Sequence, residues 1–178
     1  ELDGFDSGGT VTPTELSGAF AIEAVTVNES TFIYTIGLFD TGFSAFQLDE
    51  TGALDPLANH VDASVSGGTS LADAPNPAHA VVGGTTYLYV NASLDSAISV
   101  FSVGADGGLT LVQEVADTSA IALLGSRGKM AVASVGSSQF LVASGRSDNG
   151  ITAFEIGSDG TLTPRSSVFD TGALALSG

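Results

Sequence analysis

Cysteine and tryptophan are absent from this chain of 178 residues, and only four residues carry a positive charge. Without cysteine the chain has no disulfide, no thiol nucleophile and no cysteine-ligated metal. The four bases stand against 20 acids, a formal net charge of −16, which disfavours a nucleic-acid partner because phosphate binding needs clustered Lys and Arg. No apolar run approaches the roughly 18 residues of a transmembrane helix, so membrane insertion is not expected.

Signatures of catalysis are also scarce. The chain has no G-x-S-x-G elbow for a nucleophilic serine, no P-loop and no G-x-G-x-x-G fingerprint between a strand and a helix. Only two histidines could serve as a base. Calcium loops of the D-x-[DN]-x-[DN]-G kind are missing as well. These absences favour a non-enzymatic protein.

What the chain does contain is a stretch that occurs three times. Each copy predicts an acidic turn, a six-residue strand, a Gly-containing hairpin and the start of another strand. The copies are D-T-G-F-S-A-F-Q-L-D-E-T-G-A-L-D at 40–55, D-S-A-I-S-V-F-S-V-G-A-D-G-G-L-T at 95–110 and D-N-G-I-T-A-F-E-I-G-S-D-G-T-L-T at 148–163.

The repeat divides the chain evenly. Phe46, Phe101 and Phe154 recur at spacings of 55 and 53 residues, and a second series of aspartates recurs in another phase at 6, 62, 117 and 170. Residues 1–178 are therefore interpreted as one β-repeat domain, with repeats at approximately 6–61, 62–116 and 117–170.

Four strands are predicted in each repeat, and the short connections predict antiparallel neighbours. The first strands are expected at Ala19–Val27, Ala78–Val82 and Met130–Val135, and the second at Thr31–Ile36, Thr86–Asn91 and Gln139–Ala143. The third strands are expected at Phe43–Leu48, Ile98–Val103 and Ile151–Ile156, and the fourth at Leu54–Val61, Leu109–Val115 and Leu162–Phe169.

The third strands show apolar residues on both faces. Phe101 and Val103 point to one face of the strand, whereas Ile98 and Val100 point to the other. A sheet with two apolar faces must be covered on both sides. Four-stranded sheets of about 50 residues that stack around an axis make a β-propeller, whereas the coils of a parallel β-helix are shorter and lack tight hairpins.

One repeat resembles a known family. The segments T-T-Y-L-Y-V-N-A at 85–92, I-S-V-F-S-V at 98–103 and D-G-G-L-T at 106–110 resemble a blade of the lactonase-type β-propellers, which are similar to bacterial 6-phosphogluconolactonases. The resemblance recurs in all three repeats. It implies an all-β chain of three propeller-like blades of four antiparallel strands each.

Three blades are too few to close a ring, because propellers need about four to eight. The chain is therefore expected to be a partial propeller, or a ring completed by other copies or by missing chain. The ends of the chain match, with F-D-S-G-G at 5–9 and F-D-T-G-A at 169–173, so two copies could close a six-bladed ring.

His79 is the one candidate catalytic residue. It lies in the sequence P-A-H-A at 77–80, and lactonase-type propellers often carry Pro-x-His at this place. The resemblance would make His79 a residue of the central channel. The alternative is a chance match, since the other two repeats have no histidine there.

Asp40, Asp95 and Asp148 precede the third strand of each repeat. A propeller would gather these carboxylates on one face, where they could bind a ligand such as Ca²⁺, which takes six to eight oxygen ligands. The alternative is that each aspartate stabilises its turn by accepting backbone N–H hydrogen bonds. No cofactor is expected beyond this calcium hypothesis.

The bases are unevenly placed. Residues 1–125 hold 16 acids and no base, whereas Arg127, Lys129, Arg146 and Arg165 all follow. Either this is chance or it provides electrostatic complementarity between copies or neighbouring domains. The second hypothesis makes Arg127, Lys129 and Arg146 candidate assembly residues.

From these observations we expect a non-enzymatic structural and interaction module that packs with copies of itself or with neighbouring domains. The low lysine and high aspartate content suits an extracellular or cell-surface location. A lactone hydrolase of the propeller type is the first alternative. A repeating subunit of an extracellular filament, surface layer or virus particle is the second, because contacts that fail to close a ring produce fibres.

Overall fold

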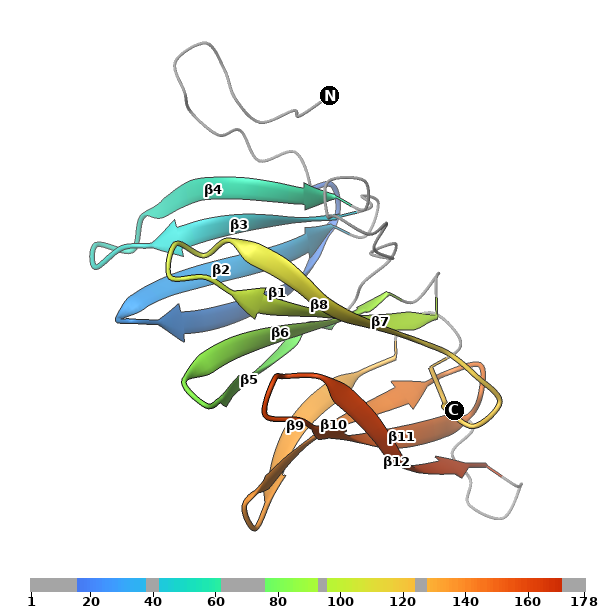
Figure 1. Ribbon diagram of the computed structural model, residues 1–178. Helices are drawn as coiled ribbons and strands as arrows, with labels where there is room; N and C mark the ends of the chain where they lie inside the picture. Colours follow the sequence, from blue (N-terminus) through green and yellow to red (C-terminus); the bar gives the residue numbers. More distant parts are fainter. Residues whose placement is uncertain (1–15, 38–41, 62–75, 93–95, 124–127, 171–178) are drawn as a thin grey trace.

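The computed structural model describes residues 16–37, 42–61, 76–92, 96–123 and 128–170, and all regular structure in these ranges is β (Figure 1). No helix that could span a membrane occurs in them. The strands are β1 (Ala19–Val27), β2 (Ser30–Gly37), β3 (Gly42–Leu48), β4 (Leu54–Val61), β5 (Ala78–Val82), β6 (Thr85–Ala92), β7 (Ala97–Val103), β8 (Leu109–Ala116), β9 (Met130–Val135), β10 (Ser138–Gly145), β11 (Gly150–Ile156) and β12 (Leu162–Phe169).

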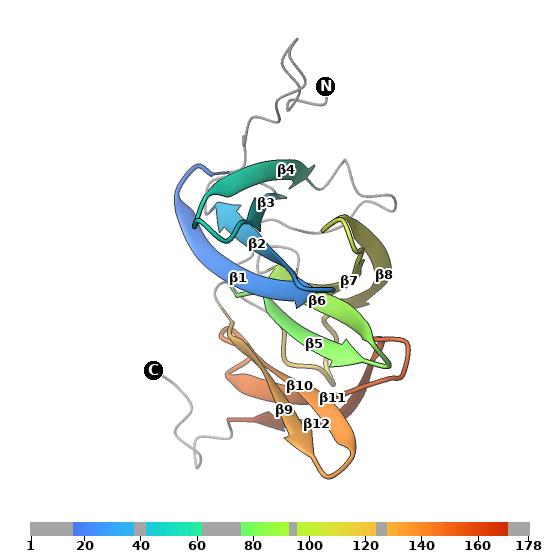
Figure 2. The ribbon, with the colours of Figure 1, turned by 90° about the vertical axis from the view of Figure 1, so that its left-hand side faces the viewer.

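The strands form three separate antiparallel sheets of four strands, each built from consecutive strands in chain order. We call them blade 1 (β1–β4), blade 2 (β5–β8) and blade 3 (β9–β12). The blades stack face to face in chain order (Figures 1 and 2). This confirms the prediction of three propeller-like blades, and the strand bounds differ from the predicted ones by no more than two residues.

The core lies between the blades. One cluster of buried side chains fills the space between blades 1 and 2, and a second fills the space between blades 2 and 3. Blade 2 divides its third strand between them: Phe101 and Val103 join the first cluster, and Ile98 and Val100 join the second. The alternation seen in the sequence thus covers both faces of the middle sheet, as predicted.

The same polar contact recurs at both interfaces between blades. The hydroxyl of Tyr34 on β2 donates a 2.7 Å hydrogen bond to the carbonyl of Gly107, and the hydroxyl of Tyr89 on β6 donates one of 3.1 Å to the carbonyl of Gly160. Burial and the nearby Asp106 charge raise the pKa of Tyr34 well above its ordinary value, so this hydroxyl stays protonated.

The accepting glycines occupy equivalent hairpins, and both have positive φ, +78° at Gly107 and +77° at Gly160. These hairpins join the third and fourth strands of blades 2 and 3. A Cβ added at Gly107 would lie 2.6 Å from the Phe32 ring. Glycine is thus needed both for the backbone conformation and for the close approach of the neighbouring blade.

We predict that Tyr34→Phe lowers the free energy of unfolding by about 1–2 kcal/mol, because it leaves the buried Gly107 carbonyl without a donor. The measurement is urea unfolding followed by circular dichroism. Tyr87→Phe is the control, since no hydrogen bond of the Tyr87 hydroxyl is found in the described part of the chain. Equal losses for the two variants would contradict this role for the Tyr34 hydroxyl.

Gly107→Ala should destabilise the fold more than Gly52→Ala. Gly52 has the same hairpin position and a φ of +86°, so either change strains the backbone by about 1–2 kcal/mol. Only at Gly107 does the added Cβ meet another blade, and overpacking of that kind costs about 1–3 kcal/mol more. Comparing the urea midpoints of the two variants isolates the packing between blades, and equal midpoints would show that Gly107 serves its hairpin alone.

Candidate functional site

The first strands of the three blades lie next to one another. β5 contacts both β1 and β9, and the fourth strands β4, β8 and β12 lie at the opposite edges of their sheets (Figure 2). We call the edge formed by β1, β5 and β9 the inner edge. In a propeller this edge faces the central channel, where ligands reach side chains from several blades.

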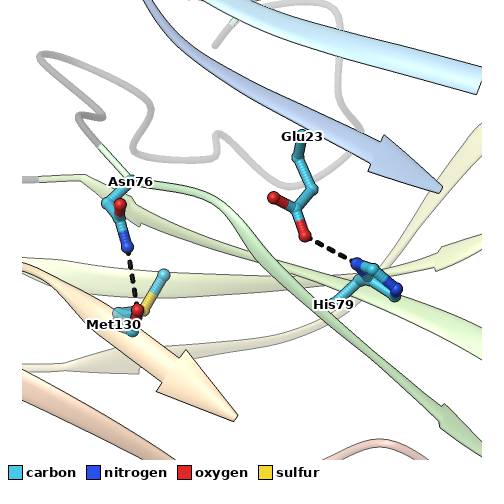
Figure 3. Close-up of polar contacts among 4 residues, drawn as sticks. All are labelled: Glu23, Asn76, His79 and Met130. Atoms are coloured by element: carbon cyan, nitrogen blue, oxygen red, sulfur yellow. Dashed lines mark hydrogen bonds and ion pairs between the residues drawn. The ribbon is translucent and has the colours of Figure 1, made fainter.

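A histidine and a glutamate from different blades meet at the inner edge. His79 Nδ1 on β5 lies 2.6 Å from Glu23 Oε1 on β1 (Figure 3). Their side chains are 36% and 24% exposed, so the pair is partly buried and still reachable from solvent. The second ring nitrogen, Nε2, points away from Glu23 (Figure 3). A histidine oriented in this way by a carboxylate can exchange a proton through Nε2.

Neither residue follows the repeat. The strand register aligns His79 with Ala24 and Val132. In each blade the repeated phenylalanine of the third strand pairs with a residue of the second strand, and that residue pairs in turn with the aligned position of the first strand. In the same way the register aligns Glu23 with Ala78 and Ala131. Two polar departures from apolar repeat positions therefore form one hydrogen-bonded pair. Packing between blades does not need them, since the blade 2–blade 3 interface forms with alanine and valine at those positions.

The hydrogen bond to Glu23 raises the pKa of His79 above the ordinary histidine value, although partial burial opposes this shift. The interaction favours the imidazolium form because the carboxylate accepts from Nδ1 and carries the opposite charge. The proton-exchanging nitrogen of this pair is thus more basic than that of an isolated histidine.

Two further contacts lie at the end of the inner edge where β1, β5 and β9 begin. The Asn76 side-chain amide donates a 2.9 Å hydrogen bond to the carbonyl of Met130, the first residue of β9 (Figure 3). The Lys129 ammonium lies 5.7 Å from the centre of the Phe20 ring on β1, a cation–π distance. Lys129 thus extends from blade 3 to blade 1 and places a positive charge at this end.

The other candidate residues are only partly accounted for. Asp40, Asp95 and Arg127 lie outside the described residues. Asp148 is half-buried in the turn between β10 and β11, directly before Asn149, whose φ is +49°. Arg146 is exposed in the same turn, and its carbonyl accepts the Asn149 N–H at 3.3 Å. The ligand-binding and assembly roles of these residues stay predictions.

No cluster of three metal-ligating side chains is found in the described part of the chain. The hairpin between β11 and β12 shows one structural role of an aspartate in this fold, the acceptance of hydrogen bonds within a turn. Asp159 Oδ1 accepts the Thr161 N–H at 3.2 Å and the Thr161 hydroxyl at 2.6 Å, and these bonds lower the pKa of Asp159. Calcium binding by the repeated aspartates remains untested.

A comparison with protein families matches residues 45–172 to the lactonase family of seven-bladed β-propellers. The chain belongs to this family. The match covers parts of all three blades, and it agrees with a fold of stacked four-stranded sheets. A search of curated protein sequences gave no match.

Solved structures agree on the fold. The chain is 18% identical to the periplasmic gluconolactonase PpgL of Pseudomonas aeruginosa, with a TM-score of 0.60, and 20% identical to a putative 6-phosphogluconolactonase of Bacteroides uniformis, with a TM-score of 0.57. The aligned regions cover 83% and 78% of this chain but 39% and 37% of those proteins. An exo-β-1,3-galactanase of Phanerochaete chrysosporium is 11% identical over 96% of this chain and 43% of its own length, with a TM-score of 0.59.

The family match overturns one expectation. A non-enzymatic structural and interaction module was predicted because no familiar catalytic signature occurs in the sequence, and that prediction was wrong. The family and its gluconolactonase neighbours favour the alternative, a lactone hydrolase of the propeller type. The inference failed because propeller sites draw single side chains from separate blades, which leaves no compact motif in the sequence.

Sequence reasoning singled out His79 but missed Glu23. The two are 56 residues apart and lie on different blades. A usable signal existed, since Glu23 is the acid among register-matched positions that otherwise hold Ala78 and Ala131. Recognising it requires the exact strand register, which the repeated phenylalanine alone does not provide.

We predict that Glu23→Gln lowers the pKa of His79 toward about 6.5. Because the pKa of His79 is raised on folding, the pair stabilises the fold most below the ordinary histidine pKa, and this stability is lost as the pH rises through the raised value. NMR titration gives the pKa, and urea unfolding from pH 5.5 to 8.5 gives the stability.

Glu155→Gln is the matched control, since Glu155 accepts its hydrogen bond from an arginine, Arg165, instead of from a histidine. Identical pH profiles of stability for the two variants would contradict a coupling between Glu23 and His79.

Proposed function

We propose that this chain forms part of a propeller-type lactone hydrolase in which His79 is the general base and Glu23 orients it. The observation that carries the proposal is the His79–Glu23 hydrogen bond at the inner edge, formed by two residues that depart from the repeat. Family membership and the gluconolactonase neighbours supply the reaction class.

The chemistry follows from the orientation of the ring. Neutral His79 donates its Nδ1 proton to Glu23 and leaves the Nε2 lone pair free to accept a proton from water. The water oxygen then attacks the lactone carbonyl carbon to form a tetrahedral intermediate. When the bond between that carbon and the ring oxygen breaks, the imidazolium returns its proton to the leaving oxygen, and the product is an open-chain hydroxy acid.

Glu23 contributes in two ways. Its hydrogen bond selects the tautomer with the proton on Nδ1, and its negative charge stabilises the imidazolium formed during the reaction. The raised pKa of His79 is the ground-state measure of this interaction. A base with a raised pKa accepts the proton of water more readily but must be deprotonated first, so activity should increase as the pH rises through that pKa.

A glycoside hydrolase is supported less well, although a galactanase shares the fold. Glycoside hydrolysis generally uses two carboxylates across the scissile bond. Among the described residues the inner-edge pair contains a single carboxylate, beside an imidazole. An imidazole with a carboxylate behind it is better suited to activate water for attack at a carbonyl.

We predict that His79→Ala lowers kcat for hydrolysis of gluconolactone by about 10²–10⁴-fold, the usual contribution of a general base. The assay is a pH-stat measurement corrected for spontaneous hydrolysis. His60→Ala is the control, because the other histidine of the chain lies on β4, away from the inner edge, and its removal should leave kcat unchanged.

Glu23→Gln distinguishes positioning from a purely structural role. It should lower kcat and shift the acid limb of the pH–rate profile to lower pH, because His79 loses the partner that raises its pKa. A structural defect would lower the rate without moving that limb. Wild-type activity in His79→Ala would refute the proposed base.

A further inference from the structure

A crevice lies between blades 2 and 3, at the end where the β5–β6 and β9–β10 hairpins turn. We call it the hairpin crevice. Val82 and Gly83 line it from blade 2, and Ser138, Gln139 and Ile156 line it from blade 3. Its volume of about 390 Å³ falls within the range of about 300–1,000 Å³ that small-molecule sites occupy. His79 is near the other end of β5, so the hairpin crevice is separate from the candidate site.

Uncharged polar groups are prominent in the lining of the hairpin crevice. The lining includes the hydroxyl-bearing Ser137, Ser138 and Ser158 and the amide-bearing Gln139. Among the described residues that line it, Glu155 is the ionisable one, and it accepts a 2.7 Å hydrogen bond from Arg165, which balances its charge. Hydroxyl and amide groups without an unbalanced charge suit a neutral ligand that both donates and accepts hydrogen bonds.

Gln139 leaves part of its amide without a hydrogen bond. Its Oε1 is buried, and no partner for this atom is found in the described part of the chain. An unpaired buried acceptor destabilises a fold, and native proteins usually supply a donor for it. If the amide is turned by 180°, the unpaired atom becomes a donor instead. A hydroxyl group completes the hydrogen bonding in either orientation, because it can donate and accept.

Packing between blades does not need a glutamine at this position. The strand register aligns Gln139 with Thr86 of blade 2, since each lies two residues before the leucine that pairs with the repeated phenylalanine. Thr86 is 4% exposed where blade 2 packs on blade 1, so a shorter side chain fills the equivalent position. Gln139 is thus a polar departure from the repeat, and it occurs at a residue that lines the hairpin crevice.

We propose that the hairpin crevice binds a neutral monosaccharide, with a sugar hydroxyl hydrogen-bonded to the Gln139 amide. An anionic ligand is disfavoured, because no basic residue is found among the described residues that line the crevice and the chain has a formal net charge of −16. No aromatic ring for a sugar to stack on is found among them either. We therefore expect weak binding, with a dissociation constant of about 1–10 mM.

NMR titration of the intact chain with D-glucose tests the proposal. The backbone amide signals of Gly83, Ser138 and Gln139 should shift with a dissociation constant of about 1–10 mM. Gln139→Thr, which introduces the residue found at the equivalent position of blade 2, should weaken this binding about five-fold or more. Threonine is favoured in strands, so this variant is expected to fold, and thermal unfolding checks that it does.

Gln113→Thr is the matched control, because both polar atoms of the Gln113 amide are paired. Its Nε2 donates to the Leu162 carbonyl at 3.2 Å, and its Oε1 accepts the Leu162 N–H at 2.7 Å. This variant should be less stable than the wild type and bind glucose equally well.

Three results would overturn the proposal. The first is an absence of shifts at the hairpin crevice up to about 100 mM glucose, which would leave water as its occupant. The second is glucose binding by Gln139→Thr that equals binding by the wild type. The third is an equal loss of binding in Gln139→Thr and Gln113→Thr, which would assign the loss to the packing of blades 2 and 3.

Discussion

The middle sheet of this chain has two apolar faces, and each face is covered by another sheet. In β7 this requirement is visible within one strand, since Phe101 packs toward blade 1 and Ile98 toward blade 3. The tyrosine hydroxyl that meets a hairpin glycine then fixes how far one blade slides over the next. Stacking of this kind brings β1, β5 and β9 together at the inner edge. The candidate site depends on that arrangement, because its two residues come from different blades.

The strand register shows which positions of this fold can hold polar side chains in place of apolar ones. Positions that pack between blades are constrained in size and polarity, as the alternation of half-buried and exposed residues along β8 illustrates. The size and polarity of residues on the first strands are less constrained, because these strands lie at the inner edge of their sheets. Glu23 and His79 occupy two of these positions and pair with each other across an interface that elsewhere holds alanine and valine.

The fold was predictable from the sequence to within one or two residues at the strand ends, because tight hairpins and a repeated phenylalanine are local signals. The site was only half predictable. His79 was found through a resemblance, whereas Glu23 could not be paired with it, since the partner of a side chain across two blades depends on how the sheets stack. The contact between Lys129 and Phe20 joins blades 1 and 3 and shows the same limit, because sequence reasoning placed Lys129 in an assembly surface.

Stacking also determines how the candidate site is assembled. Each blade that packs on another sets its first strand beside the first strand of its neighbour, as β5 does with β1. Glu23 and His79 meet only because blades 1 and 2 are stacked in this way. Loss of the stacking would separate the carboxylate from the imidazole even if each sheet stayed intact, so the pair depends on the same interface as the hydrogen bond from Tyr34 to Gly107.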